Sequence, residues 1–333
     1  MRRSIGVLLA LILAVVGSVA ASHANPRGFR ARVLALTTFG GEEAPWLTNE
    51  DWPLTFEVPG GFSPVHCQRS GVCEAQLGTT KANSGPSTMA ILNDKRLKFT
   101  QSSVFIVAGI AGIRTSVGTL GDAGIANWVV DADLGTHFVD ASNAPPTGWL
   151  PFSDYDQGAL HLNERLAERA YELTNTLELA DDAAAQAERA HYGEPEASEV
   201  PSVMRCDTAG SDEFWVGADW ADKADAIVEA RILQVAPSYD GFRCSSEFED
   251  PAIASALRRF GFLDQFIVVR TASDFEDERP GTTPRDLYDL LHSAEGFAGY
   301  GIAVENAYRV ASTVAHYLVS HPSEAAQLTG PAG

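Results

Sequence analysis

Apolar segments rich in β-branched residues recur along the chain and predict buried strands. They cover residues 32–39, 73–79, 103–112, 124–130, 202–208 and 265–272. Helical patterns lie between or after them, at residues 87–97, 162–179, 249–261 and 303–318. Strands that alternate with helices predict an α/β layered fold with a largely parallel sheet.

Ser273 and Asp274 directly follow the last of these strand segments. In open α/β sheets, ligands bind at the carboxyl ends of the parallel strands. The two residues therefore lie where such a sheet usually binds its ligand. They are the first candidates for a functional site.

Two stretches depart from this pattern. Residues 139–200 contain paired prolines, an Ala- and Glu-rich helical segment and a further Pro-containing segment, which predicts an insertion or cap over the core.

Residues 1–24 have two arginines, an apolar run and small residues at a cleavage site, as a secretory signal does. A membrane anchor is the less favoured alternative, because the run is shorter than the about 20 residues of a spanning helix. We expect a single domain over residues 25–333, secreted or periplasmic, with no membrane span in the mature chain.

The composition narrows the class of partner. Hydrophobic residues make up 45% of the chain, enough for a large core. The formal net charge is −20, and loss of the two signal arginines would make it −22. Nucleic acids are held by patches of Lys and Arg, so we expect no nucleic acid partner.

The cysteines indicate disulfides. An even number in a secreted chain favours disulfides over free thiols. Of the three pairings that remain open, we favour one that closes a turn and one that joins two segments near the candidate site. These are Cys67 with Cys73 and Cys206 with Cys244. No CxxC motif or His pair at ligand spacing accompanies them, so no metal site is expected.

Several catalytic motifs are missing from the sequence. It has no GxSxG, HExxH or GxxxxGK[ST] motif, and no GxGxxG after its first strand. Segments rich in Gly and carboxylates remain: "FGGEEAPWL" (39–47), "AGIAGI" (108–113) with "VGTLGD" (117–122), "SDEFW" (211–215) and "RTASDF" (270–275). In this order they resemble the purine nucleoside permease family over nearly the whole mature chain. The resemblance implies a three-layer nucleoside phosphorylase-like fold, with a central mixed, largely parallel sheet flanked by helices.

The resemblance also implies roles for individual residues. Asp274, beside Ser273, matches the acid that protonates or holds the leaving purine, and Glu249 matches the acid that binds the ribose hydroxyls. Phe214 and Trp215 match residues that line the base pocket. A small-residue turn whose backbone runs under the nucleoside is matched by Ala108, Gly109, Ala111 and Gly112. The implied partners are a purine nucleoside and further copies of the chain in a homo-oligomer.

The chemistry of glycosidic bond cleavage agrees with these roles. Breaking an N-glycosidic bond builds positive charge on the sugar and negative charge on the base, so it requires an acid at the base and carboxylates near the ribose. Asp274 can be that acid if burial raises its pKa. The structural alternatives are a helix N-cap for Asp274, a first-turn acid for Glu249, and core positions for Phe214 and Trp215.

The first loop bears on the nucleophile. It contains Glu42 and Glu43 and no arginine, and two carboxylates would repel a phosphate dianion, whereas one could deprotonate a water. We therefore predict hydrolysis, with Glu42 favoured over Glu43 as general base; alternatively, both are first-turn acids of a helix before Pro45. Lys81 and Arg114 lie in neighbouring turns and keep inorganic phosphate open as a co-substrate, with no other cofactor expected.

The sequence thus leaves three functions to weigh. The favoured one is an exported purine nucleosidase, or a phosphorylase, that serves nucleoside salvage. The alternative is a nucleoside-binding protein that supports uptake, which could not itself be a channel because spanning helices are lacking. A degenerate scaffold for protein contacts is disfavoured, because buried carboxylates without a use cost stability.

Overall fold

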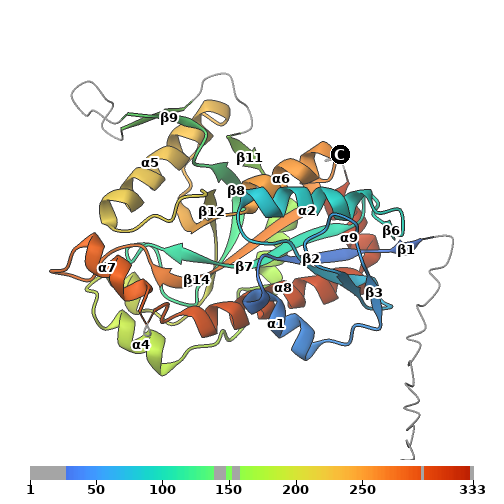
Figure 1. Ribbon diagram of the computed structural model, residues 1–333, viewed down its shortest axis with the longest axis horizontal. Coiled ribbons are helices and arrows are strands. Elements are labelled where there is room, and N and C mark those ends of the chain that lie inside the picture. Colours follow the sequence, from blue (N-terminus) through green and yellow to red (C-terminus); the bar gives the residue numbers. More distant parts are fainter. Residues whose placement is uncertain (1–27, 139–147, 152–157, 294–295, 331–333) are drawn as a thin grey trace, which may run out of the picture.

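The computed structural model describes residues 28–138, 148–151, 158–293 and 296–330 (Figure 1). The predicted signal segment, residues 1–24, lies outside the described residues. The strands of the main sheet are β2 (Val33–Thr37), β3 (Leu54–Phe56), β4 (Val65–Cys67), β5 (Val72–Gln76), β7 (Val104–Ile113), β8 (Ala123–Asp131), β11 (Ala159–His161), β12 (Val203–Gly210), β13 (Arg243–Glu247) and β14 (Phe266–Phe275). Two short pairs lie outside it, β1 (Phe29–Arg30) with β6 (Leu97–Lys98) and β9 (Gly135–His137) with β10 (Trp149–Pro151).

The main sheet is closed on itself over part of its width. Its strand order is β11-β8-β12-β13-β7-β2-β5-β4-β3, and β14 pairs with both β7 and β8. The strands β8, β12, β13, β7 and β14 thus form a ring. Five pairings of the described sheet are parallel and five are antiparallel, so the sheet is mixed, as the resemblance implies, but it is not simply parallel and its closure was not predicted. Apolar runs predict that a strand is buried, but they do not predict whether its neighbour runs parallel or antiparallel to it.

Helices cover both sides of the sheet, as expected for an α/β fold (Figure 1). They are α1 (Gly40–Asn49), α2 (Lys81–Asn93), α3 (Glu164–Thr174), α4 (Ala183–Arg189), α5 (Ala218–Val235), α6 (Asp250–Arg259), α7 (Pro284–Leu291), α8 (Tyr300–Ser320) and α9 (Pro322–Thr329). One core cluster joins the sheet to Ile91 of α2 and Leu257 of α6. A second joins its other side to Trp46 of α1, Leu166 of α3 and Val310 of α8. The apolar stripes of these helices therefore face the sheet from opposite sides.

The six predicted strands correspond to β2, β5, β7, β8, β12 and β14. The two longest, β7 and β14, are buried along almost their whole length and pair in parallel, as their continuous apolar runs predict. The end of β14 differs from the prediction, because the strand continues to Phe275 instead of ending at Ala272. The pairing register between β14 and β7 shifts between Ala272 and Asp274, so Ser273 and Asp274 lie in the irregular final part of the strand.

Residues 139–200 belong in part to the core. Residues 139–147 and 152–157 lie outside the described residues. After them, β11 pairs with β8 in the main sheet, and Leu166, Ala167 and Ala170 of α3 belong to the second core cluster. The segment from β11 to α3 therefore forms part of the domain itself, whereas we expected an insertion or cap.

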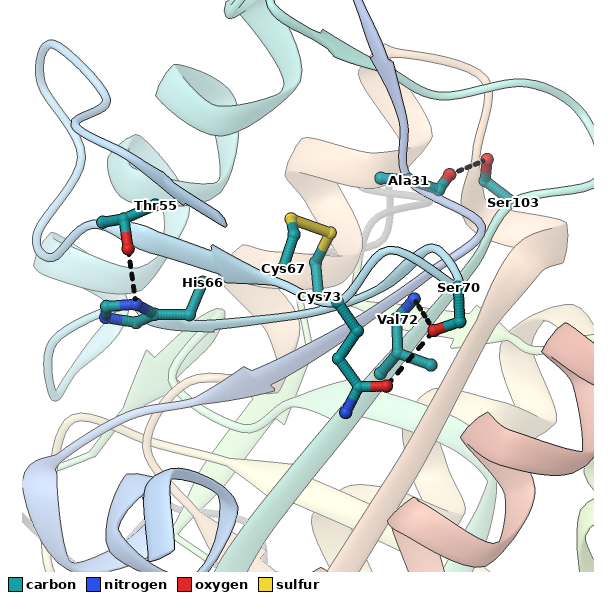
Figure 2. The surroundings of a disulfide bond; sticks show 9 residues. Ala31, Thr55, His66, Cys67, Ser70, Val72, Cys73 and Ser103 are labelled. Atoms are coloured by element: carbon teal, nitrogen blue, oxygen red, sulfur yellow. Dashed lines mark hydrogen bonds between the residues drawn. A yellow bond between two sulfur atoms is a disulfide. The ribbon is translucent and has the colours of Figure 1, made fainter. Parts of the chain in front are cut away.

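Both favoured disulfides are confirmed. Cys67 and Cys73 face each other on the antiparallel strands β4 and β5, and Figure 2 shows their bond beside the hydrogen bond between Thr55 and His66. The second bond joins Cys206 of β12 to Cys244 of β13. It links two strands of the closed ring, three residues before Glu247 at the end of β13.

Loss of the second disulfide is expected to destabilise the fold more than loss of the first. A cross-link limits the freedom of the unfolded chain, and the effect grows with loop length. The sequence separations are 38 and 6 residues, which correspond to about 4 and about 2 kcal/mol. Urea unfolding of the Cys206→Ala/Cys244→Ala and Cys67→Ala/Cys73→Ala double variants measures both losses. A larger loss for the short loop would contradict the expectation.

None of the helices in the described part of the chain has both the length and the apolar character that crossing a bilayer requires.

Candidate active site

A cavity of about 170 Å³ opens at the ends of β7, β13 and β14, between α1 and the loop that follows β12. It brings together segments that lie far apart in the sequence. Most of the predicted site residues line it: Glu42, Ala111, Gly112, Phe214, Trp215, Glu249, Ser273 and Asp274. Glu43, Ala108 and Gly109 do not line it.

Glu42 is held rigidly in the cavity wall. It lies in the first turn of α1, and its side chain is buried. One carboxylate oxygen accepts hydrogen bonds from the backbone N–H of Thr38 (2.7 Å) and its hydroxyl (2.9 Å), and the other accepts from the N–H of Ile110 (2.8 Å). Burial raises the pKa of Glu42 to about 7, although Arg270 and the hydrogen bonds oppose this rise. A carboxyl group with this pKa can accept a proton from water at neutral pH.

Glu43, the competing candidate, points elsewhere. It is half-buried and lies in the electrostatic environment of His66 and Glu74, outside the cavity. Successive residues of a helix are rotated by about 100° around its axis, so only one of two adjacent acids can face the same cavity. The geometry favours Glu42.

Arg270 organises the floor of the cavity, and the sequence analysis did not assign it a role. Its guanidinium binds three carboxylates: both oxygens of Asp250 (2.6 and 3.1 Å), Glu247 (3.1 Å) and Glu249 (3.1 Å). It also donates to the carbonyl of Ile110 (3.0 Å). The group is fully buried, so its positive charge compensates carboxylates that could not otherwise stay ionised there. The signal for it in the sequence was a lone arginine within the apolar run "FIVVRTA".

Glu249 is fixed from two sides. One oxygen accepts a hydrogen bond from the backbone N–H of Thr80 (2.9 Å), and the other binds Arg270. Glu247 is held by the same arginine and accepts from the N–H groups of Glu249 (2.5 Å) and Asp250 (2.8 Å), while its second oxygen is buried without a partner. Burial raises the pKa of both acids. Glu249 is also the N-cap residue of α6, although its side chain makes no capping bond.

Asp274 also lines the cavity. Its side chain is buried at the end of β14, and one oxygen accepts a hydrogen bond from the hydroxyl of Ser273 (2.6 Å). Burial raises the pKa of Asp274 to about 7, with a further contribution from Glu276 and an opposing one from Ser273. The alternative role as a helix N-cap is excluded, because Asp274 lies within a strand. The group is therefore suited to donate a proton inside the cavity.

Aromatic rings form one side of the cavity. Phe214 is 41% exposed, and its ring lies 6.0 Å from that of Phe248 and 6.2 Å from that of Phe297. Trp215 is 9% exposed and also lines the cavity, although its indole N–H has no partner. An exposed ring beside a cavity provides a face on which a planar heterocycle can stack. Phe248 and Phe297 were not recognised in the sequence.

The small residues of β7 have a different role from the predicted turn, because they are part of a strand. A Cβ atom at Gly109 would lie 2.7 Å from Arg270 and 2.9 Å from Glu42, so only glycine lets both groups approach this strand. Ala108 is buried and does not line the cavity. Ala111 and Gly112 form its wall.

The two cations considered for phosphate binding are both occupied. Lys81 binds Asp131 (2.9 Å) and Asp133 (2.6 Å). Arg114 lies away from this cavity, where its guanidinium binds a set of aspartates: Asp222 (2.5 Å), Asp225 (2.8 Å) and Asp277 (3.2 Å). Neither is available to neutralise a phosphate group in the cavity. Among the described residues, no cluster of His, Cys, Asp and Glu is arranged to hold a metal ion.

The fold is shared with nucleoside-cleaving enzymes of known structure. Futalosine hydrolase of Helicobacter pylori superimposes with a TM-score of 0.54 at 15% identity, covering 86% of this chain and 97% of that one. A 5′-methylthioadenosine/S-adenosylhomocysteine nucleosidase of Colwellia psychrerythraea in complex with adenine gives 0.54 at 16% identity, covering 87% and 96%. At such identities the likeness concerns the fold alone.

Similarity in sequence identifies the family. A probable purine nucleoside permease of Schizosaccharomyces pombe is 27% identical over 325 residues, covering 88% of this chain and 90% of that protein. A purine nucleoside permease of Candida albicans is 25% identical over 328 residues, covering 90% and 78%. The sequence profile of the family matches residues 30–327. The chain therefore belongs to the purine nucleoside permease family.

Proposed function

We propose that the protein cleaves the N-glycosidic bond of purine nucleosides, with water as the nucleophile. The observation that carries this proposal is the pair Glu42 and Asp274, two buried carboxyl groups on the wall of one cavity, each with a pKa raised to about 7. Hydrolysis of a glycosidic bond requires a general acid and a general base, and each works best with a pKa near the operating pH. The family name and the nucleosidase fold support the choice of substrate.

In the proposed reaction, Asp274 and Glu42 act on opposite ends of the scissile bond. Asp274 gives its proton to the base as the bond between C1′ and N9 breaks and its electron pair moves onto the purine. Water attacks C1′ and gives a proton to Glu42. The products are free purine and ribose, and proton exchange with solvent restores both carboxyl groups. Glu249 is proposed to hold the ribose hydroxyls, with its carboxylate fixed by Arg270.

The charge distribution of the cavity supports water over phosphate. Arg270 is the only Lys or Arg among the described residues that line it, and three carboxylates already surround that arginine. The undescribed internal segments, residues 139–147, 152–157 and 294–295, contain no Lys or Arg. A phosphate dianion would therefore meet carboxylates without a free cation beside it.

Release of free base from purine nucleosides tests the proposal. The pure mature protein is incubated with adenosine, inosine and guanosine in phosphate-free buffer, and the products are separated by chromatography. We expect free purine from at least one of them, in proportion to protein concentration. Absence of free base with and without phosphate would refute cleavage.

The proposed roles give the reaction a narrow pH profile. Asp274 acts in its protonated form, so activity is lost as the pH rises through about 7, and Glu42 acts in its ionised form, so activity is lost as the pH falls through about 7. We expect kcat/KM to be greatest near pH 7, to be about threefold lower at pH 6 and pH 8, and to fall about tenfold for each further pH unit. Initial rates from pH 4 to 10 measure it. A flat profile between pH 5 and 9 would contradict the roles.

A second candidate function is capture of nucleosides for uptake, which the family name supports. Without turnover, the same cavity would bind a nucleoside through Glu249 and the aromatic rings. Isothermal titration calorimetry separates the two functions. Saturable heat of binding with no free base after hours would favour capture, whereas continuing release of base would favour cleavage. In either case we propose an exported protein, because disulfides persist in oxidising compartments.

A further inference from the structure

Ser246 presents a hydrogen-bond acceptor to the cavity. Its hydroxyl donates to Glu276 (2.6 Å), a buried acid whose two oxygens also bind Arg243 (2.7 and 2.8 Å). Burial alone would raise the pKa of Glu276, but Arg243 outweighs it and holds this pKa below its ordinary value. An ionised carboxylate only accepts, so the single proton of the Ser246 hydroxyl points away from the cavity. Only lone pairs of that oxygen remain for a ligand.

The sheet places this acceptor and Asp274 on the two strands that flank β7. Ser246 of β13 and Asp274 of β14 both pair with Gly112 of the intervening strand β7, so the three residues form one row across the sheet. Both side chains line the same cavity. A Cβ atom at Gly112 would lie 3.1 Å from the Glu276 side chain and 3.2 Å from the Ser246 hydroxyl, so glycine lets these two groups pack against β7.

The row therefore combines a donor with an acceptor. In the proposed reaction Asp274 donates to N7 of the purine, and the substituent on C6 is the neighbouring group on the same edge of the base. On that edge, a 6-amino purine presents an acceptor at N7 and a donor at the amino group, whereas a 6-oxo purine presents two acceptors. The donor on Asp274 and the acceptor on Ser246 complement a 6-amino purine. With a 6-oxo purine, the lone pairs of the Ser246 oxygen would face those of the 6-oxo group.

We propose that Ser246, fixed by Glu276 and Arg243, selects 6-amino purine nucleosides such as adenosine over 6-oxo purine nucleosides such as inosine. This inference rests on the proposed placement of the base against Asp274. The direction of the Ser246 hydroxyl proton is fixed because Arg243 holds Glu276 in place. Arg243 also binds Asp225 (2.7 Å) and so cannot leave Glu276 without breaking a second ion pair.

The Ser246→Ala variant tests the selection with three nucleosides. These are adenosine, inosine and purine riboside, which has only hydrogen at C6. We expect the wild-type protein to prefer adenosine over inosine at least about tenfold, and Ser246→Ala to lower kcat/KM for adenosine about tenfold, the range for one hydrogen bond. Purine riboside, which cannot make the contact, should change less than about twofold. Ser245→Ala is the matched control, since Ser245 is the neighbouring buried serine that does not line the cavity.

Two results would overturn the inference. One is a wild-type protein that handles inosine as well as adenosine, and the other is an equal loss for both nucleosides in Ser246→Ala. If no nucleoside is cleaved, calorimetry measures the dissociation constants of adenosine and inosine for the wild-type protein and for Ser246→Ala, and their ratios replace the ratios of kcat/KM. Selective binding of adenosine without turnover would then refute the proposed cleavage and support the selection, whereas equal or absent binding of both nucleosides would refute the selection.

Discussion

Asp274→Asn lowers kcat for purine release about 100- to 10,000-fold, if Asp274 is the general acid of the reaction. The amide has the size of the carboxyl group and can still accept the hydrogen bond from Ser273, so the fold should be preserved. The purine, however, must then leave without a full proton transfer. The residual activity should also lose the decrease above pH 7, because the group that causes it is gone. Stopped assays of free base over the full pH range measure both effects.

The leaving group provides the control for this experiment. 4-Nitrophenyl β-D-ribofuranoside releases a phenolate that needs little protonation, so Asp274→Asn should cleave it at nearly the wild-type rate. Glu42→Gln should lose activity on both substrates, because water must be activated in either case. An Asp274→Asn variant that loses both activities equally would assign Asp274 to the structure of the site and not to proton donation.

Arg270→Met is expected to lower the free energy of unfolding by about 3–5 kcal/mol, because it leaves buried carboxylates without their counter-charge. The carboxylates concerned are Glu247, Glu249 and Asp250, all of which bind this guanidinium. Protonation relieves the cost, so the deficit should be larger at pH 8 than at pH 5. Urea unfolding at the two pH values measures it.

Arg285→Met is the matched control for Arg270→Met. Arg285 forms an exposed ion pair with Asp289 on α7, and we expect no measurable change in its unfolding midpoint. Arg270→Lys separates charge from geometry, because an ammonium group cannot form the forked contacts to Asp250. A deficit in Arg270→Met that is small and independent of pH would show that Arg270 does not compensate ionised carboxylates in the folded protein.

The long buried strands could be predicted from the sequence, and the short polar ones could not. β7 and β14 are ten-residue strands whose apolar runs stand out at once. β13 has the sequence RCSSE, which carries no apolar pattern, and it becomes a strand only through pairing with β12 and β7. The direction of pairing, and with it the closed ring, likewise depends on contacts that no local pattern contains.

The candidate site divides in the same way. The sequence alone predicts Glu42, Glu249 and Asp274 as site residues, and the structure places all three on one cavity. The choice of Glu42 over Glu43 depends on which face of α1 is turned toward the cavity. The role of Arg270 becomes visible only when β13 and α6 pack beside β14. Partners that lie 20 to 23 residues away, as Asp250 and Glu247 do from Arg270, have no signature in spacing.

The central claim is that water attacks the sugar while Asp274 protonates the departing base. Mass spectrometry of the sugar product, after cleavage of a purine nucleoside in H₂¹⁸O with phosphate present, tests it most directly. Hydrolysis releases free ribose and no ribose 1-phosphate, at a rate that phosphate does not change, with ¹⁸O on C1 sooner than added unlabelled ribose exchanges its anomeric oxygen, and Asp274→Asn should slow the release in step with that of the base. Ribose 1-phosphate as the product, or an intact nucleoside after long incubation, would contradict the account.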